Sequence, residues 1–431
     1  MQDSTAVKTV PQASFVTRLP LYYGWVILAA AAIGMIMTSP GQTYSVSIFL
    51  EHFIGDLGIS RSLVSTLYTV GTLTASFALP YIGKQIDRRG PRVMVGIIAG
   101  CFALACVYMG LVQNAVMLGI GFVFIRMLGQ GSLGIVSSNV INHWWVRRRG
   151  MMLSIAGVFA TLLGSGSFPS LIHALINGFG WRPSYMILGG MVAVVMLPVG
   201  LTFFRRQPED FGLLPDGATA SADDGLAGTS EPVEENWTRN EALRTSAFWI
   251  ISLAGASISA LGTGLQFHMV SIFDDAGLSA TAAAAAFMPI AIAGAVSRIA
   301  SGVLVDRVPV RFLLSAALAG QVTSLLMAPR LQGETTALLY GIVLGLTGSL
   351  QMTVSSVVWA KYFGRRHLGS ITGVAALISV AGSALGPMPM GIARDLLGSY
   401  DQALTLLAAL PFVLGIVALF ARRPYHRTGT I

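Results

Sequence analysis

Uncharged apolar stretches, each long enough to cross a membrane, recur along almost the whole chain of 431 residues. A helix of about 20 apolar residues spans the hydrocarbon core of a bilayer. Because backbone polar groups in lipid must find partners within the same segment, such stretches can fold only as helices. Charged residues make up 11% of the chain, less than half of the roughly 25% found in soluble domains. We therefore predict an all-α polytopic membrane protein.

Twelve such spans can be counted along the sequence. They lie near residues 22–50, 61–83, 92–113, 116–145, 150–176, 183–205, 244–273, 280–303, 311–329, 335–361, 368–393 and 401–421. The segment between the sixth and seventh spans differs, because it holds nine of the 19 acidic residues and three prolines. That composition is typical of a soluble linker. We expect one six-helix bundle in residues 1–205, an acidic cytoplasmic linker in 206–243, and a second six-helix bundle in 244–431.

The basic residues predict the orientation of the chain. With the N-terminus in the cytoplasm, 21 of the 27 Lys and Arg residues fall on the cytoplasmic side. The other side keeps Arg61, Arg182, Arg330 and Arg394. This asymmetry predicts that both termini are cytoplasmic. The net charge of +8 comes from short clusters between apolar spans, a pattern that argues for membrane topology and against binding to nucleic acid.

A charged cluster between the second and third spans has a twin between the eighth and ninth. Gly83, Asp87, Arg88 and Arg92 are matched, 219 residues later, by Gly302, Asp306, Arg307 and Arg311. The sequences "LGIS" at 57–60 and "AGLS" at 276–279 match at the same offset. We interpret the chain as a duplication of a six-helix unit. Parallel repeats of this kind are typical of transporters, in which one bundle rocks against the other around a central site.

The repeated G-x3-D-R-x3-R cluster resembles the signature loop of the major facilitator superfamily, and the resemblance covers the whole chain. "RMLGQG" at 126–131 resembles the arginine motif of that superfamily's fourth helix. Narrower features resemble its monocarboxylate-transporter and oxalate/formate-antiporter branch, especially the bacterial members. They are "GW" at 24–25, "WWVRRRG" at 144–150, "RRQPEDFGLLPDG" at 205–217, and Arg298 four residues before Gly302. The resemblance implies two pseudo-symmetric six-helix bundles in the cell (inner) membrane.

The resemblance also implies a gating role for both charged clusters. In the family the aspartate lies at a helix end, where arginines and the N-terminus of a neighbouring helix stabilise its charge. We expect Asp87 and Asp306, with the glycines and arginines of their clusters, to hold the cytoplasmic ends of the bundles together in one state and to release them in the other. A role confined to membrane topology is the alternative, but topology would not require the aspartate in both copies.

Arg298 is the strongest candidate for binding a substrate. It precedes Asp306 by eight residues, which corresponds to about 12 Å of helix, so it should lie deep in the membrane. An arginine there costs roughly 2.5–3.5 kcal/mol to insert and is therefore expected to have a function. The span interiors contain no Asp or Glu to balance it. A guanidinium binds a carboxylate through two parallel hydrogen bonds, so we expect an organic anion to supply the missing charge.

Three further residues are candidates for the same site. Arg126 is buried in the fourth span, where the resemblance implies a structural or coupling role as an alternative to substrate contact. His268 takes the place in the seventh span that Tyr44 takes in the first, because "SIF" at 47–49 and 271–273 fixes the register. We expect both to line the cavity. His268 is also a candidate proton carrier, because a histidine titrates near neutral pH. The bound acid is the alternative carrier.

These residues favour a secondary transporter for a small monocarboxylate such as lactate or pyruvate, coupled to a proton and acting as a monomer. Export or antiport of another organic anion or amphipathic compound is the alternative. An enzyme is disfavoured because the sequence holds no paired carboxylates, no metal-ligand spacing and no phosphate-binding loop, so no cofactor or metal is expected. A receptor that senses without transporting is disfavoured because the linker is too short and polar to be a signalling domain.

Overall fold

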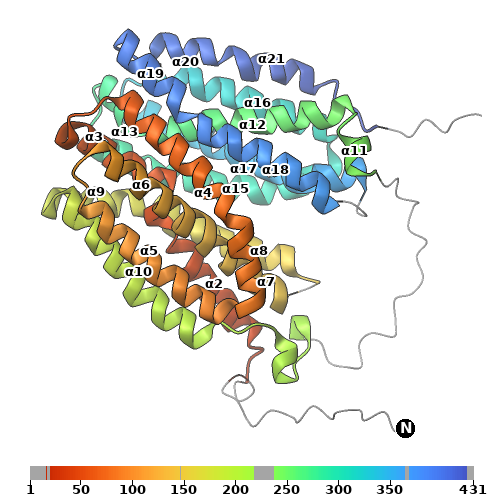
Figure 1. The fold of residues 1–431 in the computed structure, drawn as a ribbon. Helices are drawn as coiled ribbons and strands as arrows, with labels where there is room; N and C mark the ends of the chain where they lie inside the picture. Colours follow the sequence, from red (N-terminus) through yellow and green to blue (C-terminus); the bar gives the residue numbers. More distant parts are fainter. Residues whose placement is uncertain (1–15, 17–19, 146, 218–236, 365–367, 425–431) are drawn as a thin grey trace, which may run out of the picture.

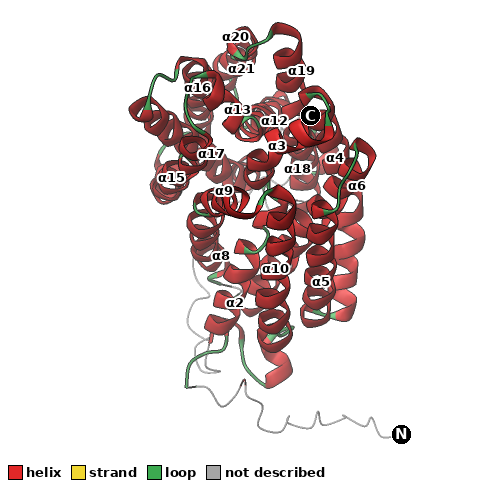
Figure 2. Cartoon of the chain, turned by 90° about the vertical axis from the view of Figure 1, so that its left-hand side faces the viewer, coloured by secondary structure: helices red, strands yellow, loops and turns green. Residues whose placement is uncertain are grey.

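The structure is a computed structural model that describes residues 16, 20–145, 147–217, 237–364 and 368–424. Within these residues every regular element is a helix, as the view in Figure 2 shows. Twelve helical stretches are long and apolar enough to cross a membrane. The predicted all-α fold of twelve membrane helices is therefore confirmed.

The first half of the chain contains six spans, several of which consist of two helical segments. Its elements are α2 (Gly24–Ile36), η1 (Ser39–Gly41), α3 (Thr43–Leu57), α4 (Arg61–Arg89), α5 (Pro91–Gly110), α6 (Ala115–Ile125), η2 (Arg126–Leu133), α7 (Gly134–Trp144), α8 (Arg149–Phe159), η3 (Ala160–Gly166), α9 (Phe168–Phe179) and α10 (Trp181–Phe203). The described parts of the linker carry η4 (Pro208–Phe211), η5 (Pro215–Gly217) and α11 (Arg239–Ala242).

The second half contains the other six spans. Its elements are α12 (Ser246–Phe267), α13 (Met269–Asp275), α14 (Ala280–Ala285), α15 (Phe287–Arg307), α16 (Val310–Met327), η6 (Ala328–Arg330), α17 (Glu334–Phe363), α18 (Leu368–Leu385), α19 (Pro387–Leu397), α20 (Asp401–Leu407) and α21 (Ala409–Ala418). The first span continues to Leu57, beyond the predicted end near residue 50, because α3 runs unbroken to the turn at Gly58.

The duplicated sequence forms the same turn in each half. Gly58 and Gly277 both adopt positive φ angles, 61° and 73°, which glycine accepts without strain. Two residues later, the side chains of Ser60 and Ser279 cap the next helices by accepting hydrogen bonds from backbone N–H groups. These turns define what we call the closed end of the molecule. The opposite end, which carries residues 83–92 and 302–311, is called the motif end.

The two halves meet at the closed end and diverge toward the motif end (Figure 1). At the closed end, the backbone N–H of Ser62 donates to Asp395 Oδ2 at 2.8 Å. Nearer the middle, Thr69 Oγ1 donates to the carbonyl of Ala384 at 2.7 Å. These bonds join α4 of the first half to the second half, and α4 packs closely on α19. Hydrogen bonds that include backbone groups therefore hold this end together.

Ion pairs at the closed end lie within one half or the other among the residues that the structure describes. Arg61 Nη1 and Glu51 Oε1 are 2.6 Å apart in the first half, which also holds a pair between Arg182 and Asp56. Arg394 Nη2 and Asp275 Oδ1 are 2.7 Å apart in the second half. Each half thus ties its own helices together with charge.

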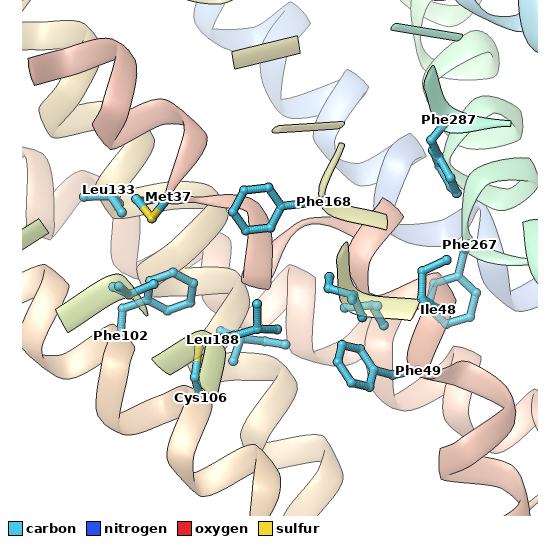
Figure 3. Packing of buried hydrophobic residues seen from close by; sticks show 14 of the residues in the cluster. Met37, Ile48, Phe49, Phe102, Cys106, Leu133, Phe168, Leu188, Phe267 and Phe287 are labelled. Atoms are coloured by element: carbon cyan, nitrogen blue, oxygen red, sulfur yellow. The ribbon is translucent and has the colours of Figure 1, made fainter. Parts of the chain in front are cut away.

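The apolar core continues from one half into the other at the closed end. Phe267 and Phe287 of the second half belong to one cluster with Ile48 and Phe49 of the first half, as Figure 3 shows. A second cluster lies in the second half and includes Trp359. The continuous core explains why the halves pack as one body at the closed end, since burying apolar surface between packed helices stabilises their contact.

Candidate functional site

A cavity of about 310 Å³ lies in the second half, against one wall from the first half. It is bordered by α12, α15, α16 and α17, with Thr161 and Ser165 of η3 closing the side toward the first half. The residues that line it are Thr161, Ser165, Ile258, Ser259, Gly262, Thr263, Gln266, Ile290, Ala291, Gly294, Arg298, Gln321, Leu344, Gly345, Gly348, Ser349, Gln351 and Met352. Eight of these 18 lining residues are polar and uncharged, nine are apolar or glycine, and Arg298 is the single cation.

Arg298 is the charged residue of this cavity. It lies on α15, is partly buried, and donates from Nη2 to the sulfur of Met352 at 3.2 Å. A thioether is a weak acceptor, so this bond leaves most of the donor capacity of the guanidinium unused. None of the described lining residues is acidic. The site therefore holds a cation without a protein counter-ion among the described residues.

Small residues make room around the guanidinium. A Cβ at Gly157 of α8 would lie 2.7 Å from Arg298 Nη1, so glycine lets the arginine reach the first half. On α15, Ala291 and Gly294 also line the cavity. A Cβ at Gly294 would meet Ser349 Oγ at 2.9 Å. Glycine at this position therefore leaves room for the Ser349 hydroxyl.

The structure places Arg126 away from this cavity. Its Nε donates to Thr72 Oγ1 at 3.1 Å, and its Nη1 donates to the carbonyl of Gly41 at 3.1 Å. The guanidinium carbon lies 4.8 Å from the centre of the Tyr68 ring, within the range of a cation–π contact. Because its donors meet groups of the first and second spans, Arg126 bonds three spans of the first half to one another. Arg126 does not line this cavity, and its contact with a substrate stays a prediction.

His268 also lies outside the cavity, contrary to the expectation from its register. Its side chain is fully buried between α12 and α13. Nε2 lies 2.9 Å from the carbonyl of Pro387, and Nδ1 lies 3.0 Å from the hydroxyl of Tyr400. A carbonyl only accepts, so the neutral ring with its proton on Nε2 satisfies both contacts. The physical reason for the difference is that α12 ends at Phe267, and the turn directs the ring toward α19 and α20.

Tyr44 lies at the contact between the halves, toward the closed end from the cavity. Its hydroxyl is 2.9 Å from Ser39 Oγ, and its ring is 6.3 Å from that of Phe287. Phe287 is one helical turn along α15 from Ala291, which lines the cavity. Tyr44 is therefore a neighbour of the cavity and is not part of its lining in this structure.

The two charged clusters lie at the motif end, where the helices that carry them end. The side chains of Asp87 and Asp306 fall outside the described part of the structure. Arg92 donates from Nε to the carbonyl of Leu201 at 2.6 Å, and the guanidinium of Arg311 lies 4.8 Å from the ring of Phe312. Gly83, Arg88, Gly302 and Arg307 lie on α4 and α15, within the predicted clusters.

Three glutamines that the sequence interpretation overlooked line the cavity. Gln266 lies near the end of α12, Gln321 lies in the middle of α16, and Gln351 lies in α17. Their signal in the sequence is an amide side chain inside an otherwise apolar span, which is weaker than the signal of a charge. Among the described residues no group of three or more metal-ligating side chains occurs.

Two halves of six membrane helices that meet at one end, with a cavity that holds one cation, are the architecture of a membrane transporter. The chain belongs to the Major Facilitator Superfamily, whose family model matches residues 26–387. A bacterial homologue of the human lysosomal transporter Spinster, solved in an inward-facing and unoccupied conformation, has the same fold. Its TM-score is 0.66 at 18% identity, over 93% of this chain and 96% of that one.

Curated relatives give the branch of the superfamily. The chain is 24% identical to the oxalate:formate antiporter of Oxalobacter formigenes over 263 residues, which cover 59% of this chain and 57% of the antiporter. Somewhat more than half of that relative's length is thus matched. The chain is 23% identical to monocarboxylate transporter 13 of Rattus norvegicus over 423 residues, which cover 93% of this chain and 92% of that protein. These matches agree with the predicted branch.

Proposed function

We propose that the protein carries a small monocarboxylate across the membrane by alternating access, and that Arg298 binds the carboxylate. The observation that carries the proposal is the guanidinium in a cavity whose described lining offers it a thioether and no acid. An anion would supply the missing charge and accept two parallel hydrogen bonds from the fork of the guanidinium. The similarity to proteins named for oxalate, formate and monocarboxylates supports this substrate class.

A monoanion suits the cavity better than a dianion. Arg298 is its one cation among the described lining residues. A second carboxylate would be buried without a cation to balance it, and an unbalanced buried charge costs several kcal/mol. We therefore infer that singly charged acids of the size of lactate or pyruvate are preferred to oxalate.

Alternating access would open the two ends of the molecule in turn. The contacts between the halves at the closed end support one state, in which the cavity is reached from the motif end. The distribution of basic residues supports a cytoplasmic motif end, with both termini on that side of the inner membrane. In this proposal the charged clusters that contain Asp87 and Asp306 join the motif ends when the cavity opens to the outside. One chain forms the whole pathway, so it acts as a monomer.

We propose that a coupled proton travels on the bound acid. His268 is fully buried outside the cavity, and its hydrogen-bond partners are a carbonyl and a hydroxyl, so a second proton would bury a charge without an acidic partner, which is costly. An acid held beside Arg298 needs no protein carboxylate, and its pKa in solution is about 4, as for side-chain carboxyls.

Uptake of labelled lactate into proteoliposomes tests the proposal. Purified protein should accumulate lactate when the outside is made acidic, and accumulation should stop when an ionophore removes the pH gradient. Liposomes that lack protein measure the passive entry of the acid. Equal uptake with and without protein, for both lactate and pyruvate, would overturn the proposal.

Exchange of one organic anion for another is the second candidate, supported by the similarity to an oxalate:formate antiporter. Counterflow separates it from proton symport. In an exchanger, labelled lactate enters only those vesicles that are loaded with unlabelled acid, and the pH gradient has no effect on the final level.

A further inference from the structure

Two buried amides in the cavity have hydrogen-bonding atoms that no described protein group satisfies. Gln321 is 1% exposed, and neither its Oε1 nor its Nε2 has a partner. Gln351 is 7% exposed, and its Nε2 donates to Ser355 Oγ at 3.0 Å while its Oε1 has no partner. Leaving a buried polar atom unsatisfied costs about 1–3 kcal/mol. Such groups call for a functional explanation.

Glycines on α12 face both amides. A Cβ at Gly255 would lie 2.9 Å from Gln351 Nε2, which is too close for a side chain to fit without displacing the amide. A Cβ at Gly262 would lie 3.9 Å from Gln321 Oε1. Because Gly255 and Gly262 have no side chains, α12 places no side-chain atoms against the amides at these two positions. Gln321 and Gln351 border the same cavity as Arg298.

The chemistry of an amide selects its ligand. Its oxygen needs a donor and its nitrogen needs an acceptor. A carboxylate only accepts and an aliphatic chain does neither, so neither can satisfy Gln321. A hydroxyl group can donate to Oε1 and accept from Nε2. Hydroxyls of Ser259 and Thr263 also line the cavity, where they are bonded to Ser379 and Ser383 at 2.8 Å.

We propose that Gln321 and Gln351 bind hydroxyl groups of a substrate whose carboxylate is held by Arg298. The preferred class is then a polyhydroxylated monocarboxylate, of the kind formed by oxidising the aldehyde of a sugar. Arg298, Gln321 and Gln351 come from α15, α16 and α17, so a ligand that reaches all three must carry polar groups along its length. This inference rests on the proposed function, because it requires the carboxylate site at Arg298.

Three probes of equal chain length separate the contributions of charge and hydroxyls. They are D-gluconate, which has both, hexanoate, which has the charge alone, and D-sorbitol, which has hydroxyls alone. Binding to the purified full-length protein is measured by titration calorimetry. Gluconate should bind at least about tenfold more tightly than hexanoate, the value of a hydrogen bond or two to a buried amide. Sorbitol should bind more weakly than gluconate.

Variants of the two glutamines test whether these residues cause the preference for gluconate over hexanoate. Gln321→Leu and, independently, Gln351→Leu should each lower the gluconate-to-hexanoate ratio by roughly tenfold and leave hexanoate binding intact. Thr323→Leu is the matched control, because Thr323 lies on the same helix as Gln321 but is exposed and does not line the cavity. The ratio of gluconate affinity to hexanoate affinity in Thr323→Leu should equal that of the unmodified protein. Elution as a monodisperse species in size-exclusion chromatography checks the folding of each variant.

The outcomes distinguish this inference from the proposed function. If gluconate and hexanoate bind equally, or if both glutamine variants keep the affinity ratio of the unmodified protein, the proposed hydroxyl site is wrong. Loss of binding in Arg298→Ala would in that case still support the proposed carboxylate site. If sorbitol binds as tightly as gluconate and Arg298→Ala changes nothing, the carboxylate site is wrong and both proposals fall. Failure of gluconate to bind also overturns the inference.

Discussion

Arg126 and Arg298 both lie inside membrane spans, one in each half, but their guanidinium groups meet different partners. Arg126 donates to Thr72 and to the carbonyl of Gly41, and it lies against the ring of Tyr68. Arg298 has the sulfur of Met352 and an open cavity. An intramembrane arginine can therefore be a structural cross-link or a ligand site, and its hydrogen-bond partners separate the two roles better than its depth does.

The largest effect is expected at Arg298. Arg298→Ala should lower substrate affinity by roughly 30-fold or more, because truncating one partner of a buried charge pair costs at least about 2 kcal/mol. Arg298→Lys should also fail, since a point charge cannot reproduce the two parallel bonds of a guanidinium. Uptake into proteoliposomes measures both. Near-normal uptake by a well-folded alanine variant would remove Arg298 from the binding site.

Arg126→Ala should instead destabilise the fold. The variant loses three hydrogen bonds from a charged donor and a ring contact, and we expect the loss to cost roughly 3 kcal/mol or more. We expect a lower thermal midpoint in detergent, with unchanged substrate affinity in the folded fraction. A loss of affinity as large as that in Arg298→Ala, at an unchanged midpoint, would contradict the comparison between the two arginines.

Substitutions in the charged clusters should lower the turnover rate and leave the substrate affinity unchanged. Asp87→Asn and Asp306→Asn should each slow turnover by roughly three- to tenfold, because a carboxylate beside the N-terminus of a neighbouring helix contributes about 1 kcal/mol. Stopped-flow uptake gives the turnover rate, and calorimetry gives the affinity. A tenfold weaker affinity in both variants at an unchanged cycling rate would exclude the gating role.

The smallest effect on coupling is expected at His268. If the bound acid carries the proton, His268→Ala still accumulates substrate uphill under a pH gradient, although the loss of the contacts to Pro387 and Tyr400 lowers its stability. Uptake should decrease as the outside pH rises, because less acid is protonated. A variant that retains counterflow but loses uphill accumulation would identify His268 as the carrier.

The fold could be predicted from the sequence because composition and span length leave helices as the only solution in lipid. The repeated turn residues, Gly58 with Ser60 and Gly277 with Ser279, also revealed the duplication. Arg298 was visible because one charge in an apolar span stands out. The positions of the other candidate side chains depend on tertiary contacts. Which partners surround Arg126, and where the break after Phe267 directs His268, depend on neighbouring spans that sequence spacing does not specify.

The ion pairs described at the closed end, such as Arg61 with Glu51 and Arg394 with Asp275, join helices of the same half. Added salt screens exposed charges over a Debye length of about 8 Å at physiological ionic strength. Salt would therefore weaken bonds inside each half, while the bonds that must break for opening include backbone groups and an apolar core. The rate of opening should then respond little to ionic strength and more strongly to temperature, and each half should move with its internal charge network unbroken.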